Sequence, residues 1–190
     1  MNYATLSLAE LVAEFGVMAR DTQAVFGALS EHQLNWRPDE TRWSVAQCFD
    51  HLLAANKRMF QSLDAAMQGR SQTIWQRMPI LPRLYGAMLI KSQTPQVRRR
   101  FTAPAQARPS ASAIDAGIIQ RFVACQHEAA ERLRSLEGRD VARTIMVSPF
   151  VSFITYSVLD GCRLIATHQR RHFEQARRVI KELGFPIAAR

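Results

Sequence analysis

Two histidines four residues apart are the clearest candidates for chemistry in this chain of 190 residues, which has five histidines. His168 and His172 lie in a segment with helical periodicity, where residues i and i+4 share one face with Cβ atoms about 5–6 Å apart. Two imidazoles in this arrangement can bind one metal ion. The same spacing is also found in helices whose histidines only hydrogen-bond to solvent, and on spacing alone that second interpretation is favoured.

A third ligand has to come from elsewhere, and His51 is the best candidate. It lies in the middle of another helical segment, beside an apolar stripe, where an imidazole needs a partner. Gln47 precedes His51 by one turn and Gln175 follows His172 by one turn, so both amides are candidates to orient a ligand ring. The alternative for both glutamines is an ordinary surface or interhelical position.

Four helical segments must position these residues. Ser7 with Glu10, and Ser44 with Gln47, have the spacing of capping boxes that start a helix. Helices of about 23–28 residues are roughly 35–42 Å long, and matched amphipathic helices bury their apolar faces best as a bundle. The sequence therefore predicts an all-α four-helix bundle that forms one domain over residues 1–190, with little room for strands. Its helices are expected at about 7–29, 44–68, 112–136 and 156–183.

A proline-containing crossover of about 40 residues, 70–111, joins the second and third predicted helices. A structureless loop of that length is unusual in a compact domain, so the apolar run 81–90 is expected to form a short extra helix. A connection this long also permits the third helix to run parallel to the second.

Two further features are expected to have structural roles. Trp43 immediately precedes the helix start at Ser44 and is expected to pack as a hydrophobic staple. Arg170, Glu174 and Arg177 follow helical spacing and predict a solvated, partly ion-paired face.

Composition excludes several classes of protein. Three cysteines without a C-x-x-C spacing argue against a disulfide framework, and the longest apolar run, 150–159, is half of what a membrane span needs. With no signal-peptide pattern at its start, the chain is expected to be cytoplasmic and not in a membrane. The run Arg98 to Arg100 beside Phe101 is the only pattern that suggests nucleic acid, and it is short and isolated, so we give nucleic-acid binding a low weight.

Several short motifs, in order along most of the chain, resemble the DinB-like superfamily, and in particular its branch called DinB-like domain two. They are Trp43-Ser44 followed by His51-Leu52, Arg100-Phe101-Thr102-Ala103-Pro104 followed by Pro109, Ser148-Pro149, and the closing segment His168 to Gln175. The resemblance implies a four-helix bundle with long crossovers, commonly a homodimer, in which three histidines hold a divalent metal ion. By position those ligands are His51, His168 and His172. Relatives often carry Glu where this chain has Gln47, an amide that is a poor general base.

Three protein ligands leave an open coordination position, which is typical of catalytic rather than structural metal sites. The ion is expected to be Zn, Ni, Fe, Mn or Co, and the sequence does not choose among them. No Glu follows His168, so the metalloprotease helix pattern is absent, and a site without a carboxylate disfavours an iron oxygenase.

Members of the family that this chain resembles include transferases that use bacillithiol, mycothiol or glutathione. The resemblance therefore implies a metal-dependent enzyme that adds a low-molecular-weight thiol to a small electrophile, or a hydrolase. A non-catalytic metal-binding or structural bundle stays open as the alternative.

Overall fold

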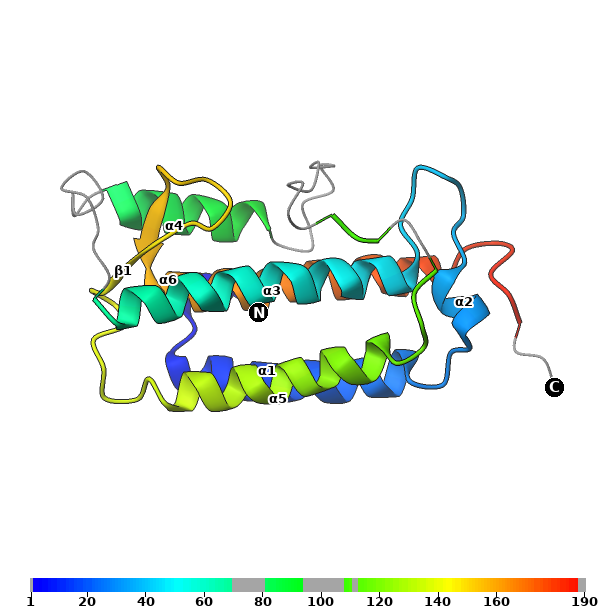
Figure 1. Cartoon of the computed structure of the whole chain (residues 1–190), viewed down its shortest axis with the longest axis horizontal. Helices are drawn as coiled ribbons and strands as arrows, with labels where there is room; N and C mark the ends of the chain where they lie inside the picture. The colour runs from blue at the N-terminus through cyan, green and yellow to red at the C-terminus, as the bar shows by residue number, and fades with distance from the viewer. Residues whose placement is uncertain (1, 70–80, 94–107, 111–112, 188–190) are drawn as a thin grey trace.

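Four long helices form the body of the molecule in the computed structural model, which describes residues 2–69, 81–93, 108–110 and 113–187. The fold is an all-α bundle, as predicted, and its helices lie in two pairs (Figure 1). In one pair α1 packs against α5, and in the other α3 packs against α6. The bounds are Leu8–Phe26 for α1, Val45–Met67 for α3, Ile118–Arg134 for α5 and Val158–Val179 for α6.

Helices α3 and α5 run in the same direction. Residue numbers in the contacts between them increase together along both helices, from Phe49 with Phe122 through Asn56 with Cys125 to Asp64 with Arg132. A parallel neighbour needs a connection that returns along the bundle, which explains the long crossover. Within that crossover the predicted extra helix is present as α4, Leu81–Ser92, which packs on α6.

The helix starts follow the capping signals where these are complete. Ser7 with Glu10 and Ser44 with Gln47 both form reciprocal capping boxes. The third long helix begins at Ile118, several residues after the predicted start near residue 112. Asp115 lies just before this helix, where its carboxylate accepts a hydrogen bond from the Gly117 backbone and pairs with Arg121.

A two-stranded antiparallel ribbon precedes the last helix, and the expectation of a chain almost without strands missed it. Strands β1, Ile145–Val147, and β2, Thr155–Ser157, pair with Met146 opposite Tyr156. The predicted start of the last helix at 156 is therefore wrong, because residues 155–157 are extended and Ser157 caps the helix from Val158. Two short helical segments also went unpredicted, the 3-10 turn η1, Tyr3–Thr5, and α2, Glu31–Asn35.

Two buried apolar clusters fill the interior, one toward each end of the bundle. Four aromatic rings meet in one cluster, one from each long helix, and the contacting ring centroids are 4.8–5.3 Å apart. Two of the three pairs are edge to face and the third is tilted. We call these rings the aromatic layer: Phe26, Phe49, Phe122 and Phe173. The other cluster contains Phe15, Met59, Leu133 and Tyr156.

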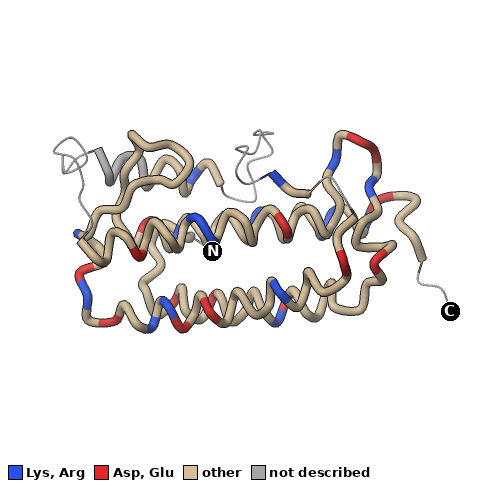
Figure 2. The backbone as a smooth tube through the Cα atoms, viewed as in Figure 1, with Lys and Arg blue, Asp and Glu red and all other residues tan. Residues whose placement is uncertain are grey.

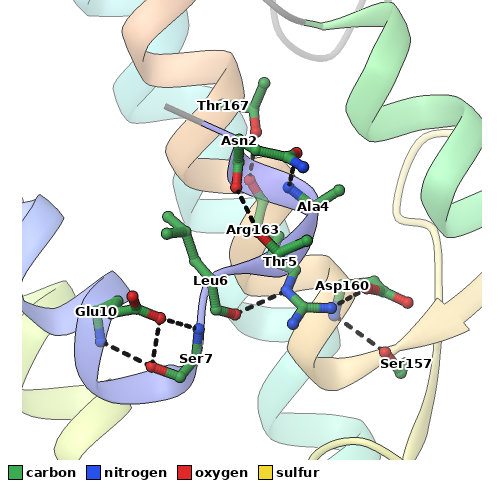
Figure 3. A network of polar contacts seen from close by, with 10 residues as sticks. All are labelled: Asn2, Ala4, Thr5, Leu6, Ser7, Glu10, Ser157, Asp160, Arg163 and Thr167. Atoms are coloured by element: carbon green, nitrogen blue, oxygen red, sulfur yellow. Dashed lines mark hydrogen bonds and ion pairs between the residues drawn. The ribbon is translucent and has the colours of Figure 1, made fainter.

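The N-terminal turn is held against α6 by polar contacts (Figure 3). The Arg163 guanidinium donates a hydrogen bond to the Leu6 carbonyl at 2.9 Å and pairs with Asp160 at 3.0 Å (Figure 3). These contacts bring the first residues of α1 beside the first turns of α6, so the two helices run parallel.

Basic and acidic residues are interspersed along the described chain (Figure 2). The run Arg98 to Arg100, which prompted the nucleic-acid hypothesis, lies outside the described residues. Among the helices that are described, none combines the length and the apolar character that crossing a membrane requires.

Candidate metal centre

Three histidine rings from two antiparallel helices meet at one place between α3 and α6. His51 lies in the second turn of α3, and His168 and His172 lie one turn apart on α6. The three ring centroids are 4.6–5.0 Å apart, and the Nε2 atoms of His51 and His168 are separated by 3.2 Å. One nitrogen from each ring can be chosen so that all three lie within 4.8 Å of one another, a spacing that suits a single ion.

Burial keeps the imidazoles of His168 and His172 in the neutral form that binds metal. The exposed fractions of His51 and His172 are 4% and 8%, and His168 is partly buried. Desolvation and the neighbouring His51 ring lower the pKa of His168 to about 3, and desolvation also lowers the pKa of His172 well below its usual value. Because two facing Nε2 atoms cannot both carry a proton, at least one lone pair points at its neighbour.

Trp43 forms a wall of this cluster, a role that the staple interpretation did not predict. Its ring stacks on His172 at 5.6 Å with an interplanar angle of 21°, and it lies 5.0 Å from the His51 ring. The sequence signal was the position of Trp43 just before the helix that carries His51. Nothing local could indicate contact with His172, which is far along the chain.

A model of the DinB superfamily matches residues 14–176, a span that includes all three histidines. The chain belongs to the DinB superfamily. No curated protein and no solved structure matches it. Membership of the DinB superfamily and the histidine cluster together fit a metal-binding DinB-like protein.

Gln47 is used mainly for folding in this DinB-superfamily chain. Its Oε1 accepts a hydrogen bond from the Ser44 backbone and its Nε2 donates to the Ser110 carbonyl, each at 3.1 Å. Asp50 accepts a hydrogen bond from the Ser110 backbone at 2.8 Å. These bonds attach residue 110 to the first turns of α3, and a role for Gln47 in orienting His51 stays a prediction.

Gln175 lies close enough to His172 to raise the pKa of that ring slightly, against the larger effect of burial. Even so, the buried Nδ1 atom of His172 has no hydrogen-bond partner among the described residues. A ring nitrogen of a metal-bound histidine usually donates its proton to a neighbouring group. The unpartnered Nδ1 of His172 is free to act as the ligand atom, so the donor set fits a metal ion. The orienting role of Gln175 stays a prediction.

We predict that the metal-free protein loses stability as the pH falls below about 6.5. Unfolded His168 takes up a proton near pH 6.5, whereas folded His168 does so near pH 3. Unfolding therefore takes up protons in this range, and the free energy of unfolding falls as the pH decreases. A fully shifted histidine contributes about 1.4 kcal/mol per pH unit, and partial exposure of His168 reduces this to about 1 kcal/mol.

Urea unfolding of metal-free protein at pH 7 and pH 5 measures this contribution. The decrease is expected to be about 1–2 kcal/mol smaller in His168→Ala than in the wild type. The exposed His127 provides the control, because His127→Ala removes an imidazole that is not buried. Equal decreases in all three proteins would contradict the prediction.

Proposed function

We propose that His51, His168 and His172 hold one divalent metal ion, with at least one coordination position left for a ligand. The observation that carries this proposal is that nitrogen atoms of three largely buried imidazoles, from α3 and α6, lie within 4.8 Å of one another. Zn, Ni, Fe, Mn and Co are all compatible with imidazole ligands. Ca and Mg are disfavoured because they require oxygen ligands.

We further propose that the protein transfers a low-molecular-weight thiol to a small electrophilic molecule. In this reaction the S–H bond breaks and the sulfur forms a bond to the electrophilic atom. The bond from that atom to its leaving group breaks, the leaving group departs with the electron pair, and the thiol proton passes to solvent or to the leaving group. A bound divalent ion supplies the positive charge that favours the thiolate form of a thiol. Support comes from membership of the DinB superfamily and from the position of the histidines.

The chain's own residues contribute positioning to this reaction. Trp43 packs against two of the histidine rings and restricts their orientation. The Ser110 backbone, held by Gln47 and Asp50, lies beside the first turns of the helix that carries His51. A substrate bound at this end of the bundle would therefore lie next to a backbone segment that hydrogen bonds hold against α3.

The test uses protein purified without a histidine tag, stripped of metal and reloaded separately with each of the five ions. Glutathione, mycothiol and bacillithiol are then offered with a chromogenic aryl halide, and an activated ester tests for hydrolysis. The proposal predicts turnover that needs both the metal and one of the thiols. Stoichiometric metal with no turnover in any assay would contradict the transferase proposal and leave metal binding intact.

A non-catalytic metal-binding bundle is the second candidate. The observation that favours it is that the residue one turn before His51 is Gln47, an amide used in helix capping, rather than a carboxylate that could act as a general base. In that case metal binding raises the melting temperature and no thiol is consumed. The single domain, the homodimer and the cytoplasmic location expected from the sequence stay predictions.

A further inference from the structure

A second set of buried polar side chains lies inside the bundle, and one of its members, Gln169, directly follows His168 in the chain. Each long helix contributes one member, and all four are at most 1% exposed. We call this cluster the polar layer: Thr22 of α1, Asn56 of α3, Gln126 of α5 and Gln169 of α6.

Helix geometry places the polar layer across the middle of the bundle. Three members lie four residues from a ring of the aromatic layer, and residues i and i+4 share one face of a helix. The polar residue precedes the ring on α1 and α6 and follows it on α5. Because α5 runs opposite to α1 and α6, all three polar residues lie on the same side of the aromatic layer. The pairs are Thr22 with Phe26, Gln126 with Phe122, and Gln169 with Phe173. The fourth member, Asn56, is at the same level because its Nδ2 contacts the Sγ of Cys125 at 3.8 Å.

Five polar atoms of this layer have no hydrogen-bond partner in the described part of the chain. They are the side-chain oxygen and nitrogen of Gln126, the same two atoms of Gln169, and the hydroxyl oxygen of Thr22. Leaving buried donors and acceptors unpaired is costly, and native interiors rarely do so. The apolar clusters toward the two ends of the bundle offer no partners.

Water fits this chemistry better than any apolar ligand. A buried water molecule typically makes about three hydrogen bonds and needs two to four polar partners. The polar layer provides donors in both amides and acceptors in both amides and the hydroxyl. We propose that the polar layer is an internal binding site for a small cluster of water molecules, which bridge α1, α5 and α6.

A cleft on the surface between α3 and α5 lies beside this layer. The cleft has a volume of about 430 Å³, and Leu53, Ala129 and Cys125 are among its lining residues. Cys125 directly precedes Gln126 and bonds to Asn56, so the wall of the cleft is one residue away from the polar layer. None of the three histidines lines this cleft, and the proposal does not rest on metal binding.

The test compares Gln126→Met with Gln120→Met. The two changes are chemically identical and lie on the same helix, but Gln120 is exposed. Oxygen-17 magnetic relaxation dispersion reports the number of long-lived internal water molecules. Gln126→Met is expected to lose at least one such water and to melt about 3–6 °C lower, whereas Gln120→Met keeps the wild-type values.

An unchanged number of long-lived waters in a folded Gln126→Met protein would overturn the proposal, as would a higher melting temperature. Helical circular dichroism establishes folding without reference to metal. If Gln126→Met does not fold, NMR spectroscopy of the wild-type protein provides the test instead. Cross-peaks between long-lived water and the side-chain amides of Gln126 and Gln169 support the proposal, and direct contact between the two amides without such water overturns it.

Discussion

His168→Ala is expected to abolish stoichiometric metal binding and to weaken the affinity for the ion by at least about 100-fold. Loss of a group that only orients a ligand already costs 10–100-fold, and removal of a ligand costs more. Among the described residues the possible ligand group contains only His51, His168 and His172, so no other described imidazole replaces His168. Metal content by mass spectrometry and titration of tag-free protein measure the change.

His127→Ala is the matched control for this experiment. His127 is an exposed histidine on α5, outside the cluster, and its removal is expected to leave both stoichiometry and affinity unchanged. Trp43 gives a second readout because it stacks on His172, and its fluorescence should respond to a paramagnetic ion such as Ni²⁺. An affinity within threefold of the wild type in His168→Ala would refute the three-histidine site.

Arg170→Ala is expected to cost about 3–5 kcal/mol of folding stability, a fall of roughly 10 °C in melting temperature. The Arg170 guanidinium bonds to Glu14 at 2.7 Å and to Asp21 at 2.8 Å. The exposed fraction of Glu14 is 5%, and this carboxylate also accepts a hydrogen bond from the Tyr3 hydroxyl. Burial and the Glu14 charge raise the pKa of Tyr3 to about 12, so the hydroxyl stays a donor. Without Arg170 a buried carboxylate loses its cation.

Two further proteins make the Arg170 experiment specific. Arg177→Ala removes a more exposed ion pair with Glu174 on the same helix, and is expected to cost less than about 1 kcal/mol. Combining Glu14→Gln with Arg170→Met removes both charges, and should recover much of the lost stability because no unpaired charge stays buried. Equal costs for Arg170→Ala and Arg177→Ala in thermal unfolding would contradict the burial argument.

Local sequence signals predicted most of the helical framework. The capping boxes at Ser7 and Ser44 depend on side chains three residues from the helix start, so they could be identified without any tertiary contact. The apolar run that became α4 was likewise recognisable. The ribbon of β1 and β2 was not, because strands of three residues are too short to show an alternating pattern.

Long-range packing decided the environments that local patterns misjudged. Arg170 was expected on a solvated face, yet its guanidinium reaches Glu14 of α1 and is largely buried. Helical spacing tells which side chains share a face, but not which neighbouring helix covers it. The same limit applies to Trp43, whose stacking partner His172 lies on another helix.

The sequence by itself determined that His168 and His172 share a face, since backbone hydrogen bonds fix the helical period wherever a helix forms. It offered His51 as a third ligand from its place beside an apolar stripe, and resemblance to a family pointed to the same residue. Only the tertiary structure brought His51 to within 3.2 Å of His168, a residue 117 positions away. The tertiary structure also places the four members of the polar layer at the same height along the bundle. Such distances depend on how α3 and α6 cross and how far each is displaced along the bundle, which is settled by the packing of both apolar clusters at once.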